Sequence, residues 1–196
     1  EPLDFVASHP MAGGERTGWR HAQAGLFEGA PVILTPLKVT RREAVLRVGR
    51  FWQALGGDVS LTTPEDHDRI FARVSHLPHA AAFALVAPTA SQGPLSDMDF
   101  AGKGWADSSR IAASDDALWA GIFLHHPKRM DQGLKDLAAE IARLRRLLKA
   151  GQAAPLRAWL RKAARFRQAS VVSPRWASPS PYSPWHPDRS LRAACA

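Results

Sequence analysis

The stretch from Glu65 to His79 constrains the fold more than any other part of this sequence. Thr63 is a good N-cap, Pro64 suits the first helical position, and apolar residues then recur at helical spacing, which predicts a helix. Pro78 cannot donate a backbone N–H and crowds the preceding turn, so we expect the helix to kink or break there. Three histidines lie around this point: His67, His76 and His79. A single histidine is more simply interpreted as a helix-surface residue, but this concentration favours a functional site.

Length and composition limit the class of protein. A chain of 196 residues can hold one domain of ordinary size and part of another. We find no apolar run long enough to span a bilayer and no signal peptide, so we expect no membrane partner. A single cysteine, Cys195, excludes a disulfide framework and fits a reducing, cytoplasmic compartment. The chain begins at Glu1 rather than Met, and we expect it to be a piece of a longer product.

The net charge of +8 is concentrated between positions 140 and 168. Such a basic segment can bind nucleic acid or another polyanion. No aromatic stacking platform or known nucleic-acid motif accompanies the charge, so we interpret it as a solvated helix face and expect no nucleic-acid partner. The basic residues are Arg143, Arg145, Arg146, Lys149, Arg157, Arg161, Lys162, Arg165 and Arg167.

Residues 1–62 have the pattern of an α/β domain. Short apolar runs at 3–7, 31–36 and 58–62 predict strands. Thr40–Glu43 reads as a capping box that opens a helix, and Gly56-Gly57 closes that helix. This strand–helix–strand order indicates the end of a parallel-sheet domain.

Residues 63–168 are predicted to be helical, with a loop from Ser91 to Trp105. The long helix after Pro127 carries a heptad seam that suits packing on another helix, in this chain or in a partner: Leu134, Leu137, Ile141, Leu144 and Leu148. Pro155 opens the last helix. Residues 169–196 are rich in proline and serine, and we expect a disordered tail. The predicted fold is therefore mainly α, with the end of an α/β domain followed by an all-helical domain.

Three blocks of sequence stand in a fixed order. The first is SHPMAGGERTG from Ser8, the second runs from His67-Asp68 to Ser75-His76-Leu77-Pro78-His79, and the third is GWADSSRIA from Gly104 with Trp119 after it. Over roughly residues 5–168 they resemble the prephenate/arogenate (cyclohexadienyl) dehydrogenase family of tyrosine biosynthesis. The resemblance implies a Rossmann-type domain that binds NAD or NADP, and a helical domain that forms a homodimer and closes the substrate cleft.

The resemblance also implies the reaction, which is oxidative decarboxylation of prephenate or arogenate. Hydride leaves the ring carbon that bears the hydroxyl group, carbon dioxide is lost, and the ring becomes aromatic. A neutral imidazole should accept the hydroxyl proton, and the family's catalytic histidine corresponds to His9. Arg110 matches the family's carboxylate-binding arginine, whose guanidinium can hold a carboxylate bidentately.

Further site residues carry over from the family. His79 matches a substrate-contacting histidine, Glu15 matches an acidic residue that can pair with the arginine and gate the pocket, and Gly104 makes the turn that leads to Arg110. Trp119 matches an aromatic wall, although it could equally be core. Asp68 and Ser75 lie on one helix face and are expected to orient His76. Asp68, Ser75 and His76 are therefore predicted to support the site without contacting the substrate.

Some features depart from the family and leave alternatives open. The Gly-x-Gly-x-x-Gly fingerprint does not occur in this sequence, so the cofactor-binding residues are unknown, and we expect this piece alone to be inactive. His126 replaces a common asparagine. The choices between NAD and NADP, and between prephenate and arogenate, stay open. One alternative is a non-catalytic dimerising remnant. Another is a metal-dependent phosphohydrolase using His67-Asp68, His76 and His79, although we expect no metal.

Overall fold

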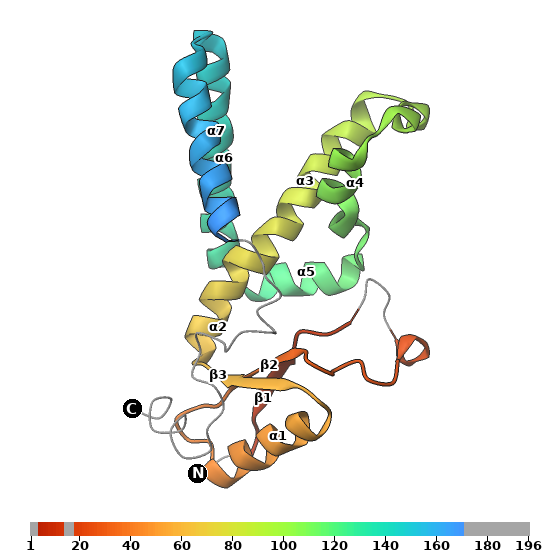
Figure 1. Cartoon of the computed structure of the whole chain (residues 1–196), viewed down its shortest axis with the longest axis vertical. Helices are drawn as coiled ribbons and strands as arrows, with labels where there is room; N and C mark the ends of the chain where they lie inside the picture. The colour runs from red at the N-terminus through yellow and green to blue at the C-terminus, as the bar shows by residue number, and fades with distance from the viewer. Residues whose placement is uncertain (1–3, 14–17, 171–196) are drawn as a thin grey trace.

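The protein, in a computed structural model, is described for residues 4–13 and 18–170. A small three-stranded sheet lies at one end of the molecule, and helices extend away from it (Figure 1). The strand order is β1-β2-β3, with β1 at Ala7–Pro10, β2 at Pro31–Thr35 and β3 at Asp58–Leu61. β2 and β3 are parallel, whereas β1 is antiparallel to β2. A short 3-10 turn, η1 (Trp19–His21), lies between β1 and β2.

The core of this part lies between the sheet and helix α1 (Arg42–Ala54). Val32, Leu34 and Val45 are fully buried there. β2 is a continuous apolar run, as expected for a central strand covered on both faces, and α1 is the crossover that joins the parallel pair. The predicted strand–helix–strand unit at 31–62 is confirmed, whereas the first strand, predicted at 3–7, lies at Ala7–Pro10.

The predicted capping box at the start of α1 is wrong. The N-cap residue is Arg41, and its side chain makes no capping hydrogen bond. The Thr40 hydroxyl is used elsewhere: it accepts a hydrogen bond from the Leu37 amide at 3.0 Å and donates to the Phe5 carbonyl at 3.5 Å. These tertiary contacts tie the chain before β1 to the loop before α1. The other end of α1 is as predicted, because Gly56 has φ +86°, a left-handed conformation that favours glycine.

The stretch from Glu65 to His79 forms one continuous helical run. It comprises α2 (Pro64–Phe71), the π-helical turn η2 (Ala72–His76) and α3 (Leu77–Gln92). The Thr63 side chain accepts the Asp66 amide at 3.1 Å, which confirms the predicted N-cap. The sequence predicts a kink or a break at Pro78, and the structure shows no break there. The wider π-turn directly before this proline is the only departure from α geometry, and the run continues through Pro78 and Pro88.

Because this helical run is unbroken, its length reaches that of a membrane-spanning helix. Within the described residues, Pro64–Gln92 is the one helix whose length and composition would allow it to cross a bilayer, with a mean hydropathy of 1.3 over its best window. Only 11% of that window is buried. This finding differs from the sequence analysis, which found no apolar run long enough to span a bilayer. Length and composition alone are weak grounds for a span, and an apolar, exposed helix also suits contact with another protein chain.

The predicted loop from Ser91 to Trp105 is largely helical. It contains η3 (Leu95–Phe100) and the start of α4 (Lys103–Ser109), which leads into η4 (Arg110–Ala113). α4 and η4 pack back along α3 (Figure 1). These elements are too short to show an apolar period, so the glycine, serine and aspartate residues dominated the sequence pattern.

The remaining helices are α5 (Asp116–His125), α6 (Pro127–Ala150) and α7 (Ala153–Ala169). α6 ends at Gly151, which has φ +66°, and α7 returns beside it to form a projecting hairpin (Figure 1). The last helix begins at Ala153, two residues before the predicted Pro155, which lies in its first turn. The predicted tail lies almost wholly outside the described residues.

Candidate functional site

The site begins with a hydrogen-bonded line of three side chains that joins the sheet to the helical run. His9 lies on β1, and its Nδ1 is 2.8 Å from Nε2 of His67 on α2. Nδ1 of His67 is in turn 3.0 Å from Oδ1 of Asp68. The predicted catalytic histidine is therefore connected to a carboxylate through a second imidazole.

An apolar ring packs beside this line. Phe71 is buried at the end of α2 and stacks on His67 with ring centroids 4.5 Å apart. Its centroid is 4.6 Å from that of His9. Burial lowers the pKa of His9 from 6.5, and the neighbouring His67 lowers it further. A neutral imidazole at this place is suited to accept a proton.

A second group of rings follows on the π-turn and α5. His76 stacks over His126 at a centroid distance of 5.6 Å and meets Trp119 edge-on at 6.2 Å. Burial lowers the pKa of His76, and so do the nearby imidazoles of His126, His67 and His79, while Asp68 raises it. Nδ1 of His76 is buried without a hydrogen-bond partner in the described part of the chain. Asp68 bonds to His67 and lies 3.8 Å from Nδ1 of His126, and its charge also acts on His76.

His79 and Trp119 form the closest ring contact of the site. Their planes are 19° apart and their centroids 3.5 Å apart. Nδ1 of His79 lies 2.9 Å from the backbone carbonyl oxygen of Ser75. Because a carbonyl oxygen can only accept, the contact is a hydrogen bond donated by Nδ1–H of His79, and Ser75 contributes through its backbone. Trp119 is 8% exposed. Its indole is therefore largely buried and packs on His79, while its role in a substrate site stays a prediction.

The remaining predicted residues lie on other segments. Arg110 begins η4 with an exposed side chain, on the segment that packs along α3. Gly104 lies inside α4 rather than in the expected turn, and a Cβ added there would meet open space. Glu15 falls at positions 14–17, outside the described residues.

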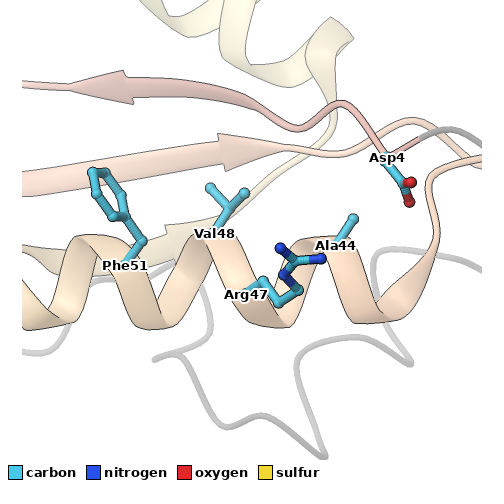
Figure 2. Close-up of a pocket in the computed structure, with 5 residues that line it drawn as sticks. All are labelled: Asp4, Ala44, Arg47, Val48 and Phe51. Atoms are coloured by element: carbon cyan, nitrogen blue, oxygen red, sulfur yellow. The ribbon is translucent and has the colours of Figure 1, made fainter.

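Two pockets lie away from the imidazoles. One, of about 350 Å³, is bounded by α1 and the segment before β1, and Figure 2 shows its lining of Asp4, Ala44, Arg47, Val48 and Phe51. The other, of about 340 Å³, is mostly apolar and lies at the far end of α3 against η3 and α4. Neither lining includes a histidine. Across residues 4–13 and 18–170 no three His, Cys, Asp or Glu side chains are grouped to hold a metal ion, so the phosphohydrolase alternative gains no support.

Comparison with known proteins decides the family. Residues 63–162 match the model of the dimerization domain of prephenate dehydrogenase, and residues 2–61 match the model of its nucleotide-binding domain. The chain belongs to the prephenate dehydrogenase family. The resemblance inferred from the three sequence blocks is thus confirmed, together with the predicted fold class.

Individual members of the prephenate dehydrogenase family agree with this assignment. Cyclohexadienyl dehydrogenase of Zymomonas mobilis is 34% identical over 72% of this chain, and prephenate dehydrogenase of Bacillus subtilis is 31% identical over 91%. A crystal structure of prephenate dehydrogenase from A. aeolicus, in complex with hydroxyphenyl propionate and NAD+, superposes with a TM-score of 0.76 at 35% identity, covering 84% of this chain and 58% of that one. The chain spans about half the length of the curated relatives it matches, 49% and 48%.

Sequence reasoning missed three members of this site. His67 was counted among the clustered histidines but given a role only as a metal ligand, His126 was noted only as a replaced asparagine, and Phe71 was given no role. The signal that was available is local: His67 and Phe71 are four residues apart, so they share a helix face. The contact of His67 with His9, across 58 positions, is a tertiary fact that helical periodicity does not contain.

Proposed function

We propose that this chain forms the substrate-binding and dimerising part of a prephenate or arogenate dehydrogenase that transfers hydride to NAD or NADP. The observation that carries the proposal is the half-buried His9, whose pKa is lowered and whose Nδ1 is hydrogen-bonded through His67 to Asp68. Family membership supplies the reaction, and this arrangement supplies a suitable base.

The chemistry requires a base for one proton. As the hydroxyl group of the substrate loses its proton, hydride departs from the same ring carbon and a ring carbonyl forms. Loss of the carboxylate as carbon dioxide then sends its electron pair into the ring, which becomes a phenolate. His9 holds the hydroxyl proton during this sequence and can return it to the phenolate oxygen, so the imidazole is regenerated. NAD or NADP, when bound, accepts the hydride.

The other site residues bind and orient the substrate in this proposal. Arg110 holds a substrate carboxylate, and Glu15 pairs with it as a gate. His79, held by the Trp119 ring and by the Ser75 carbonyl, contacts the substrate in the cleft. His76 and Asp68 contact the neighbouring rings without touching the substrate. Gly104 lies in α4, the helix that leads to Arg110.

The cofactor and the partner follow from the same proposal. The described residues include no glycine-rich strand–turn–helix unit that could cradle a pyrophosphate, although residues 2–61 match the family's nucleotide-binding domain. We infer that turnover needs a further segment that supplies the missing nucleotide-binding residues. The holoenzyme is this chain together with that segment and the bound cofactor. A homodimer through the helical domain fits residues 63–162, and a cytoplasmic enzyme fits the single cysteine, Cys195.

The test of the base is His9→Asn in the holoenzyme. We expect kcat to fall about 10²–10⁴-fold with little change in substrate affinity, because the amide cannot accept the proton. His125→Gln is the matched control, since His125 bonds only the Gly121 carbonyl within α5 among the contacts described. An unchanged kcat in His9→Asn would remove His9 from the mechanism.

The test of the remnant alternative is binding of NAD+ to this chain alone. A chain that neither binds NAD+ nor gains activity in the holoenzyme would be a dimerising remnant. A chain that fails to bind NAD+ alone but turns over in the holoenzyme would match the proposal.

A further inference from the structure

The His67 imidazole has a partner at each of its two ring nitrogens. Nε2 is 2.8 Å from Nδ1 of His9, and Nδ1 is 3.0 Å from Oδ1 of Asp68. A neutral imidazole has one N–H donor and one bare acceptor nitrogen. The position of the proton on His67 therefore determines which nitrogen of His9 can carry one.

The carboxylate decides between the two possible arrangements. Asp68 can only accept a hydrogen bond, so His67 must hold its proton on Nδ1. Nε2 of His67 is then bare and accepts from Nδ1–H of His9. The opposite arrangement would place a bare ring nitrogen of His67 against the carboxylate oxygen at 3.0 Å, with two lone pairs facing each other.

The favoured arrangement leaves the lone pair of His9 on Nε2. Across the described ranges, that nitrogen makes no hydrogen bond, so it is available to a ligand. Phe71 packs against both rings, with centroid distances of 4.5 Å to His67 and 4.6 Å to His9. The rings are therefore held by packing as well as by hydrogen bonds.

We propose that His67 is a positioning residue which, backed by Asp68, holds His9 in the tautomer whose Nε2 accepts the substrate's hydroxyl proton. The consequence for the reaction rests on the proposed function, in which His9 is the base. His67 does not touch the reacting atoms. When His9 gains the proton on Nε2, its Nδ1–H still donates to Nε2 of His67, and the hydrogen bond from His67 to Asp68 keeps that acceptor in place.

Protonation of His67 would reverse this arrangement. A cationic His67 donates from Nε2, so Nδ1 of His9 becomes the acceptor, its proton moves to Nε2, and the base is lost. The titratable groups around His67 are His9 on β1, Asp68 on α2, His76 on η2, and His126 before α6, which faces Asp68. The test is therefore made at pH 8, well above the value of about 6.5 of a free imidazole.

The direct test is nitrogen NMR of this chain with 15N-labelled histidine at pH 8, without substrate or cofactor. We expect His9 to be protonated on Nδ1 and bare on Nε2. His67→Leu should remove this preference, and His67→Gln, whose amide can accept from His9 but can also donate to it, should keep part of it. Asp68→Asn tests the backing residue without changing the packing, and should weaken the preference because an amide can donate to His67 as well as accept.

Kinetics of the holoenzyme give the second readout. We expect His67→Leu and Asp68→Asn to lower kcat by about 10- to 100-fold with KM within about twofold, since a mispositioned base costs less than its removal. His67→Gln should recover part of the loss, whereas a merely structural role for His67 would not distinguish Gln from Leu. His125→Gln is the histidine control, and the melting temperature of each variant checks folding.

The outcomes separate this proposal from the proposed function. A parent His9 protonated on Nε2, or an unchanged tautomer in both His67→Leu and Asp68→Asn, overturns the positioning role whatever the activity. Loss of kcat in His9→Asn with no loss in these two variants overturns it as well, while leaving His9 as the base. An unchanged kcat in His9→Asn overturns the base itself, and with it the consequence drawn for the reaction.

Discussion

His79 lies flat on the indole of Trp119, with ring centroids 3.5 Å apart and planes inclined by 19°. Aromatic pairs of this kind contribute about 0.5–1.5 kcal/mol beyond the area they bury. The Trp119 ring also contacts the rings of Phe123 and His76, so the indole that stacks on His79 is itself held by two further rings. The orientation of the His79 ring therefore depends on contact with a buried residue.

The first prediction is that His79 and Trp119 are energetically coupled. In a double-mutant cycle of His79→Gln and Trp119→Leu, the coupling in the free energy of unfolding should be about 0.5–1.5 kcal/mol, measured by urea denaturation. Pairing Trp119→Leu with the exposed His125→Gln should be additive within about 0.5 kcal/mol. Equal behaviour of the two cycles would show that the stack adds nothing.

The second prediction concerns pH and stability. The pKa values of His9 and His76 are both lowered, chiefly by burial, so the unfolded chain binds protons at these sites more readily than the folded chain. Stability from these two groups is therefore complete above the unfolded value of 6.5 and is lost as the pH falls below it through the lower folded values. The free energy of unfolding should fall between pH 8 and pH 5.

Substitution identifies the source of this slope. His9→Asn together with His76→Gln removes both groups, so the double variant should lose less stability between pH 8 and pH 5 than the parent. Both proteins are measured by urea denaturation at the two values of pH. Identical losses would mean that other groups carry the pH dependence.

The third prediction concerns Arg110. If its guanidinium binds a substrate carboxylate that is ionised in both ground and transition states, its loss acts mainly on binding. A charge-assisted bidentate contact is worth roughly 1.5–3 kcal/mol, so Arg110→Gln should raise KM about 10- to 150-fold in the holoenzyme. Arg110→Lys should recover only part of the affinity, and Glu15→Gln should have a far smaller effect. A KM within about twofold of the parent, or abolished kcat at saturating substrate, would exclude the anchoring role.

Elements that depend on neighbouring residues in the chain could be predicted from the sequence. β2 and α1 follow directly from their apolar patterns, and the N-cap of α2 follows from Thr63. The π-turn at Ala72–His76 does not, because no residue preference distinguishes it from the break that Pro78 suggests. Thr40 shows the same limit: its pattern fits a capping box, but its hydroxyl is bound by Phe5 and Leu37 instead.

The residues of the candidate site also fall into those that local motifs identify and those that depend on long-range contacts. His9, His79 and Trp119 could be named from motifs, because the family's residue types recur at their positions. The roles of His67 and His126 could not, since both depend on contacts between elements that are distant in sequence. Helical spacing places Asp68 on one face with Ser75 but does not decide which histidine the carboxylate meets. The structure places Asp68 beside His67 and His126.

The last prediction is that this chain forms a homodimer through the α6 seam, because the folded chain leaves part of that seam open. Leu134, Ile141 and Leu148 are 40%, 52% and 58% exposed, whereas Leu137 and Leu144 are half-buried. These exposed residues recur at seven-residue spacing along α6 and so form a stripe on one face of it, which suits a helix of a second copy. α6 belongs to the hairpin that projects from the rest of the molecule (Figure 1). The dimerization-domain match over residues 63–162 supports the same partner.

The exposed positions give the cleaner test. Ile141→Glu with Leu148→Glu puts charge on the stripe without disturbing side chains that are half-buried within the chain, so the variant should become monomeric in light scattering while keeping its helical content. Leu137→Glu with Leu144→Glu should also disrupt the dimer, but at a cost to the chain's own packing. Ala139→Glu, on the opposite exposed face of α6, is the control and should stay dimeric. A parent that is monomeric at the concentrations used, or an Ile141→Glu and Leu148→Glu variant that remains dimeric, would show that the second copy does not bind along this stripe.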